Sequence, residues 1–198
     1  MNIQAFWGVI GTYNQQTIPA QILLLLFLVL SIALSYTGKV KWLAKLSLGI
    51  ANLFIGIAFF AQYGTEAIQK FFALPLYLLI GFLFLYESRH SKEDSLERPT
   101  PFQLLLLALY LLYPFISVLS GNHFPQMVTY IMPCPIVSLS IAVYGGYQKK
   151  NKLLLILLTL WGLTGVKSVI FHAYEDIILL ICGIYGIKLL INDRHRVS

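Results

Sequence analysis

The sequence predicts an all-α bundle of seven membrane-spanning helices, and three observations support this fold class. Of the 198 residues, 58% are hydrophobic and only 11% are charged, whereas soluble domains carry about 25% charged residues. The apolar residues lie in stretches close to the ~20 residues that a helix needs to cross a bilayer. The basic residues lie mainly in every second connection between those stretches, which is typical of the cytoplasmic loops of a membrane protein.

The chain is predicted to form a single membrane domain over residues 1–198. Residues 1–18 hold Trp7 and Tyr13 among apolar and amide residues, which predicts an interfacial segment at the lipid headgroups. The predicted spans are 19–36, 46–63, 71–86, 102–120, 127–147, 153–171 and 177–192. The longest polar run, 87–101, is predicted to be a loop. Because the N-terminus lacks the basic region of a signal peptide, we expect the first apolar stretch to remain in the mature protein.

The distribution of the fourteen Lys and Arg residues predicts the orientation of the bundle. Twelve of them lie on the side that holds the C-terminus: Lys39, Lys41, Lys45, Arg89, Lys92, Arg98, Lys149, Lys150, Lys152, Lys188, Arg194 and Arg196. The other side holds only Lys70 and Lys167. The positive-inside rule therefore predicts an outer N-terminus and a cytoplasmic C-terminus. The net charge of +6 reflects this orientation and contact with anionic lipid, and no nucleic-acid partner is expected.

The fifth segment is predicted to be broken at Pro133-Cys134-Pro135. A proline removes one helical hydrogen bond and clashes with the carbonyl four residues earlier, so Pro133 and Pro135 free the carbonyls of Thr129 and Ile131. Proline also disfavours the α conformation in the residue before it, so we expect extended backbone at the residues preceding both prolines, Met132 and Cys134.

The simplest arrangement is a short outer helix, a break, and a half helix that begins near Ile136. Pro135 would then be its first residue, and Cys134 would lie near its N-cap. Irregular backbone is tolerated at membrane depth where it is buried in protein or lines a water-filled cavity. The positive N-terminal end of such a half helix can hold an anion or stabilise a thiolate. The alternative is a simple proline kink with a buried, unreactive thiol.

Polar residues gather in the predicted outer half of the last four spans. An ionisable residue in a span is costly, so Lys167 is the strongest single indication of function, and Asp176 is its natural partner. Alternatively, Lys167 extends outward to the interface, and His123 and His172 face water. The candidate residues for binding a substrate or ion are Tyr113, His123, Tyr130, Cys134, Trp161, Lys167, His172 and Asp176.

The same residues suggest three functional hypotheses, none of which includes a recognisable catalytic set. The first is a small transporter or channel-like protein for a small solute or ion, with its site in the outer half of the bundle. The second is a membrane-embedded redox, metal-binding or haem-binding protein; Cys134, Cys182 and His123 are the candidate ligands of a soft metal, although their spacing is not that of a known motif. The third is an accessory scaffold subunit without a site. No cofactor follows from the sequence.

A set of residues in a fixed order also resembles a known family. These are Tyr13-Asn14, Tyr113-Pro114, Gly121, His123-x-Pro125, Pro133-Cys134-Pro135, Trp161 and Asp176. In this order they are similar to an uncharacterised bacterial multi-pass membrane family, the domain of unknown function number 6064. Ile136 and Val137 follow the Pro-Cys-Pro here, where the family often has hydroxyl residues. The resemblance implies a bacterial inner-membrane location and implies no activity.

Overall fold

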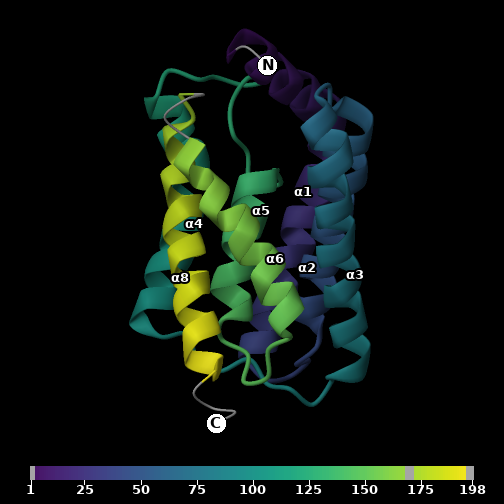
Figure 1. The fold of residues 1–198 in the computed structure, drawn as a ribbon, viewed down its shortest axis with the longest axis vertical. Helices are drawn as coiled ribbons and strands as arrows, with labels where there is room; N and C mark the ends of the chain where they lie inside the picture. The colour runs from purple at the N-terminus through teal and green to yellow at the C-terminus, as the bar shows by residue number, and fades with distance from the viewer. Residues whose placement is uncertain (1–2, 168–171, 195–198) are drawn as a thin grey trace.

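A computed structural model describes the whole chain except residues 1–2, 168–171 and 195–198. The described part holds seven α-helices, two π-helical stretches and two 3₁₀ turns (Figure 1). The elements are α1 (Ile3–Tyr36), α2 (Leu43–Phe54), η1 (Ile55–Tyr63), η2 (Gln69–Ala73), α3 (Leu74–His90), α4 (Pro101–Leu119), α5 (Pro133–Tyr144), α6 (Lys152–Leu163), η3 (Thr164–Lys167), η4 (Tyr174–Asp176) and α8 (Ile177–Arg194). The predicted all-α class is confirmed.

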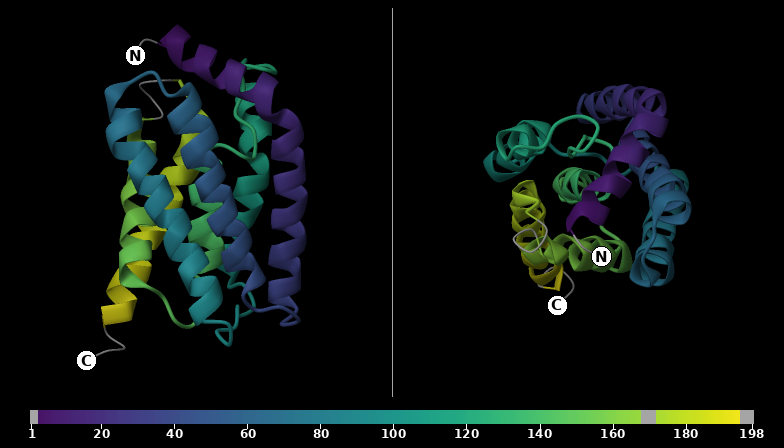
Figure 2. Two further views of the ribbon diagram at one scale, coloured as in Figure 1. Left: turned by 90° about the vertical axis from the view of Figure 1, so that its right-hand side faces the viewer. Right: turned by 90° about the horizontal axis from the view of Figure 1, so that it is seen from above.

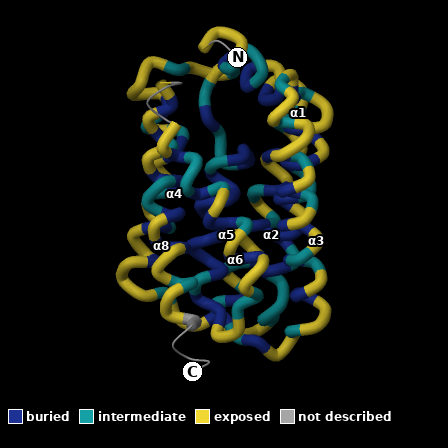
Figure 3. Tube along the Cα trace, in the orientation of Figure 1, coloured by how far each residue is buried: buried dark blue, intermediate teal, exposed yellow. Residues whose placement is uncertain are grey.

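Several of these helices suit a bilayer by length and composition. The stretches that are long and apolar enough to cross one are Ile3–Tyr36, Leu43–Tyr63, Gln69–His90 and Pro101–Leu119. Exposed residues lie along the outside of the bundle (Figure 3), and they include large apolar side chains such as Leu23, Phe71 and Leu119. An apolar surface of this extent is a liability in water, so it is compatible with a membrane protein. Seven spans and their orientation stay predictions.

Residues 3–18 of the predicted interfacial segment and the first predicted span, 19–36, form one continuous helix. α1 runs for 34 residues with Pro19 inside it, and its first part lies across one end of the bundle before the helix turns along it (Figure 2). Proline is a usual cause of such a bend, because it removes one backbone hydrogen bond and crowds the preceding turn. The predicted interfacial segment and the first predicted span are therefore parts of one bent helix, and the interfacial position of residues 1–18 stays a prediction.

The fifth segment is broken, although not as predicted. Residues 120–132 contain no helix, and α5 begins directly at Pro133. Met132 is extended, with φ −133° and ψ 165°, as expected for the residue before a proline. Cys134 is helical, so the extended backbone predicted for it and the predicted start near Ile136 are both wrong. Since the first residues of a helix have no intrahelical acceptor for their N–H groups, Pro133 and Pro135 both fit its first turn.

The half helix α5 occupies the centre of the bundle. Figure 2, seen from above, shows α5 surrounded by the other helices. All twelve of its residues are buried except Cys134, which is half-buried. Twelve residues form a helix only about 18 Å long at 1.5 Å per residue. The break therefore brings a helix N-terminus into the interior of the protein.

Tyrosine hydroxyls from two other helices stabilise the end of the unwound segment. The hydroxyl of Tyr13 in α1 donates a hydrogen bond of 2.6 Å to the carbonyl of Ile131. The hydroxyl of Tyr77 in α3 donates one of 2.7 Å to the carbonyl of Pro133. The Ile131 carbonyl is one of the two that the prolines were predicted to free, and the structure supplies its donor from 118 residues away.

Amide and hydroxyl side chains satisfy the earlier part of the segment. The Nδ2 of Asn14 donates to the carbonyls of Pro125 at 2.8 Å and Met127 at 2.9 Å. The Oγ of Ser117 in α4 accepts from the N–H of Val128 at 3.0 Å. Backbone groups that leave a helix inside a membrane must find such partners within the protein. Neighbouring helices therefore take the place of the missing helical turn.

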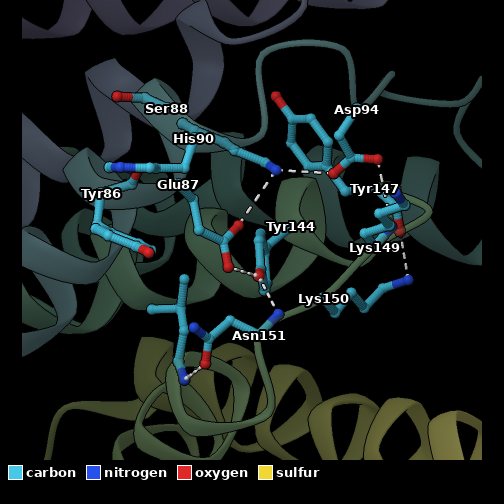
Figure 4. A network of polar contacts seen from close by, with 12 residues as sticks. Tyr86, Glu87, Ser88, His90, Asp94, Tyr144, Tyr147, Lys149, Lys150 and Asn151 are labelled. Atoms are coloured by element: carbon cyan, nitrogen blue, oxygen red, sulfur yellow. Dashed lines mark hydrogen bonds and ion pairs between the residues drawn. The ribbon is translucent and has the colours of Figure 1, made fainter.

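A buried charge cluster closes the opposite end of the bundle. The ammonium of Lys45 is fully buried and lies 3.2 Å from Glu87 Oε2 and 2.8 Å from Asp94 Oδ2. The Lys45 Nζ also lies 4.3 Å from the centre of the Tyr147 ring. The hydroxyl of Tyr144 donates to Glu87 Oε1 at 2.7 Å (Figure 4). This cluster joins α2, α3, α5, the α3–α4 loop and the α5–α6 loop.

We predict that Tyr13→Phe lowers the free energy of unfolding by about 1–3 kcal/mol, because it leaves the buried Ile131 carbonyl without a donor. Tyr36→Phe is the matched control: it removes a hydroxyl of the same helix that is also buried and has no partner among the described residues. Denaturant unfolding in detergent measures both. Equal stability of the two variants would contradict the role given to Tyr13.

We also predict that Lys45→Met destabilises the protein by about 3–5 kcal/mol, since it leaves two buried carboxylates without their cation. Lys41→Met is the control, because the pair of Lys41 with Glu93 spans 3.7 Å and is exposed, which limits its worth to about 0–1 kcal/mol. Thermal unfolding of the two purified variants makes the comparison. A Lys45→Met protein as stable as the control would show that the cluster is not structural.

Candidate functional site

A cavity of about 290 Å³ lies beside the start of α5. The N-terminal part of α1 covers it, and η1, η2, the unwound segment, the end of α6 and the turn before α8 complete its wall. The lining residues are Phe6, Ile10, Phe59, Phe60, Glu66, Ile68, Gln69, Phe72, Ala73, Val128, Met132, Pro133, Cys134, Pro135, Trp161, Thr164, Lys167, Ala173 and Asp176.

The wall of the cavity is largely apolar and aromatic. The indole of Trp161 packs edge-to-face against Phe60, with ring centres 5.6 Å apart, and against Tyr77, with ring centres 5.0 Å apart. These contacts fix the orientation of the indole. The Nε1 of Trp161 is buried and interacts with the thiol of Cys134, and no hydrogen bond of normal geometry joins it to a described residue. Since a buried indole N–H usually has an acceptor, this donor is available to a ligand or to water.

Close helix packing positions the acidic end of the cavity. Gly162 of α6 lies against Gly183 of α8, and a Cβ on Gly162 would come within 2.7 Å of the Gly183 Cα. A Cβ on Gly165 would come within 2.6 Å of the carbonyl oxygen of Asp176. Glycine at these positions lets the two helices approach, and this approach brings Asp176 to the side of the half helix.

The carboxyl of Asp176 is half-buried and faces the first turn of α5. It interacts with the thiol of Cys134, while its Oδ1 is buried without a hydrogen-bond partner among the described residues. Asp176 lies in the turn before the apolar segment of α8. Burial raises the pKa of this carboxyl from 3.8 to about 7, the hydrogen bond with Cys134 lowers it, and the charge of Glu175 raises it. Burial therefore favours the protonated form of this carboxyl.

Glu175 is a second unusual carboxyl. It is fully buried, and neither of its oxygens has a hydrogen-bond partner in the described part of the structure. Burial raises the pKa of this carboxyl above its usual value. Glu175 is not part of the cavity wall, so it influences the cavity through its charge next to Asp176. Sequence reasoning did not select it, because it lies at the end of a loop.

The structure brings four of the eight predicted binding residues together. Cys134, Trp161, Lys167 and Asp176 all line the cavity. Lys167 is exposed, and no ion pair joins it to Asp176. The predicted pairing of these two charges is therefore absent from the described structure, although both belong to the same wall.

The other four predicted residues lie outside the wall. Tyr113 is buried, and its hydroxyl lies 2.8 Å from the Oγ of Ser138. The hydroxyl of Tyr130 donates to the carbonyl of Leu111 at 3.1 Å. The remaining two, His123 and His172, are exposed.

The candidate metal ligands are not grouped. Cys134 is half-buried and Cys182 is fully buried, and both are free thiols. His123 is exposed and outside the cavity wall. Within the described ranges no three His, Cys, Asp or Glu side chains are placed so that they could hold a metal ion.

A family model described as a family of unknown function, DUF6064, matches residues 3–198. The chain belongs to this family. No curated protein and no solved structure matches it.

In this DUF6064 protein the residues that carry the resemblance gather around the break. Tyr13 and Asn14 bind the carbonyls of the unwound segment. Pro133-Cys134-Pro135 forms the first turn of α5. Two further residues of the set, Trp161 and Asp176, line the cavity. Positions that are distant in the sequence therefore share one place in the fold.

Sequence reasoning missed the aromatic part of this DUF6064 site. Phe6, Phe59, Phe60 and Phe72 belong to apolar helices, where phenylalanine is common in any core or lipid-facing surface. Their pattern contains no signal that separates a cavity wall from a packed interior. Only the position of the bend in α1 and of the break before α5 leaves these side chains around an open space.

Proposed function

We propose that this DUF6064 protein is a multi-pass protein of the bacterial inner membrane that binds a small solute or ion in the cavity beside α5 and moves it across the bilayer. The observation that supports the proposal is a cavity at the N-terminus of a buried half helix, with the unpartnered Asp176 Oδ1 and Trp161 Nε1 in its wall. Broken helices whose ends meet a central binding site are a recurring feature of secondary transporters.

The arrangement of the connections supports an outward position for this cavity. The connections α1–α2, α3–α4 and α5–α6 and the last turn of α8 all lie at the end of the bundle away from the start of α1 (Figure 1). These are the connections that hold most of the Lys and Arg residues. If the basic end is cytoplasmic, as the positive-inside rule requires, the cavity belongs to the outer half of the bundle.

The two alternative functions have less support from the geometry. The redox or metal-binding alternative combines the Cys134 thiol with a histidine, and neither His123 nor His172 belongs to the cavity wall. An accessory scaffold gives no reason to keep a cavity with buried, unpartnered polar atoms, which are costly in a protein interior. Solute binding accounts for both the cavity and those atoms.

We predict that filling the cavity removes a bound solute and its transport. Thr164→Phe places a bulky ring in the wall, whereas Thr12→Phe makes the same change at an exposed position outside it. Mass spectrometry of small molecules that co-purify with the protein should find a compound with the wild type and the Thr12 variant but not with the Thr164 variant. Uptake of that compound into proteoliposomes should follow the same order.

Folding of each variant is checked by its unfolding temperature and its elution in size exclusion. Identical co-purifying compounds and identical uptake for the two folded variants would contradict the proposal. A constant protein partner, retained by both variants without any bound compound, would favour the scaffold function instead.

A further inference from the structure

Three features of the cavity define the charge of its ligand, and the first is an excess of negative groups: among the described residues, its wall holds the carboxyls of Glu66 and Asp176 and the one ammonium of Lys167. Asp176 has no cation partner among the described residues. The ion pairs found there join Lys45 to Glu87 and Asp94, and Lys41 to Glu93, all far from the cavity wall. A carboxylate that leaves water without a cation is strongly disfavoured, so Asp176 either holds a proton or pairs with a cation that enters the cavity.

The second feature is the acidic side chain that lies at the N-terminus of α5. The positive end of a half helix usually attracts an anionic group. Here the carboxyl of Asp176 interacts with Cys134, the second residue of α5, so the protein places its own acidic group at that end. An anionic ligand would meet this carboxylate, and the repulsion would offset the attraction of the helix end. A cationic ligand would instead pair with a carboxylate that the helix stabilises.

The third feature is the aromatic wall. Phe59, Phe60, Phe72 and Trp161 line the same cavity as Asp176. Aromatic rings attract cations, with tryptophan the strongest of them, and they also cover apolar groups. A bare metal ion gains little from such a wall, whereas an organic ammonium uses both the carboxylate and the rings. At about 290 Å³ the cavity is at the lower end of the range for small-molecule sites.

We propose that the ligand of this cavity is a small organic cation, an ammonium group attached to an apolar or aromatic body. This inference rests on the proposed function, in which the cavity binds a solute. Asp176 pairs with the ammonium, and the rings of Phe60 and Trp161 contact the body. Lys167 is exposed, so its ammonium can remain in water while the ligand is bound.

Calorimetric titration of the protein in lipid nanodiscs with three probes of one carbon skeleton tests the charge. Phenethylammonium, phenethyl alcohol and phenylacetate differ only in the head group. Phenethylammonium should bind at least about tenfold more tightly than the alcohol, since a charged hydrogen bond contributes about 1.5–3 kcal/mol. Phenylacetate should bind most weakly. This ranking uses the wild-type protein, so it does not depend on the folding of any variant.

Two variants then locate the charge that selects the cation. Asp176→Asn should abolish the preference for phenethylammonium over phenethyl alcohol and leave the affinity for the alcohol unchanged. Lys167→Gln should leave the affinity for phenethylammonium unchanged or raise it, because it removes a positive charge from the wall. The unfolding temperature of each variant controls for its fold.

Three outcomes would overturn the inference. Tightest binding of phenylacetate, lost in Lys167→Gln, would show an anion site and would leave the proposed solute cavity intact. Equal binding of the alcohol and the ammonium would show an apolar site without charge selection, again leaving the cavity intact. Binding of none of the three probes would reject this ligand class, whereas the Thr164→Phe comparison decides separately whether the cavity binds any solute.

Discussion

The hydrogen bonds from side chains to the unwound backbone before α5 are the constraint on which the rest of the structure depends. A carbonyl buried in an apolar interior needs a hydrogen-bond donor, so a break at Pro133 exists only because other helices supply donors. Tyr13 and Asn14 in α1 and Tyr77 in α3 do so. These bonds hold the N-terminal part of α1 over the break, and α5 therefore begins in the middle of the bundle. The cavity is the space that remains between the N-terminal part of α1 and the first turn of α5.

The two ends of the bundle differ in how they treat buried charge. At the basic end, the Lys45 ammonium pairs with the carboxylates of Glu87 and Asp94, and the Tyr144 hydroxyl donates to Glu87. One cation and two carboxylates leave a single excess negative charge in this cluster. Beside α5, the carboxyls of Asp176 and Glu175 have no cation among the described residues. A satisfied ionic cluster rigidifies the fold, whereas an unsatisfied acidic group beside a cavity favours binding. In the proposed function, the solute binds in the cavity beside Asp176 and must then pass the layer that holds the Lys45 cluster.

The sequence could predict the features that follow from composition and from proline. Apolar stretches predicted the helices closely, because membrane length and hydrophobicity leave few alternatives, and Pro133 predicted the extended Met132. The exact start of α5 was missed by three residues, since the helix N-terminus tolerates a proline at more than one position. Four residues of the cavity wall could be selected from the sequence, because polar side chains are unusual in apolar segments. They are Cys134, Trp161, Lys167 and Asp176. The phenylalanines of the wall and the donors from α1 could not be predicted, because their roles arise only from contacts between distant segments.

The most direct test of this account is an experimental density map of the protein crystallised from a lipid mesophase, inspected over residues 120–144. The account predicts an extended chain inside the bundle up to Met132, a helix that begins at Pro133, and density that joins the Tyr13 hydroxyl to the Ile131 carbonyl. A continuous helix through residues 127–144 with its side chains against lipid would contradict it.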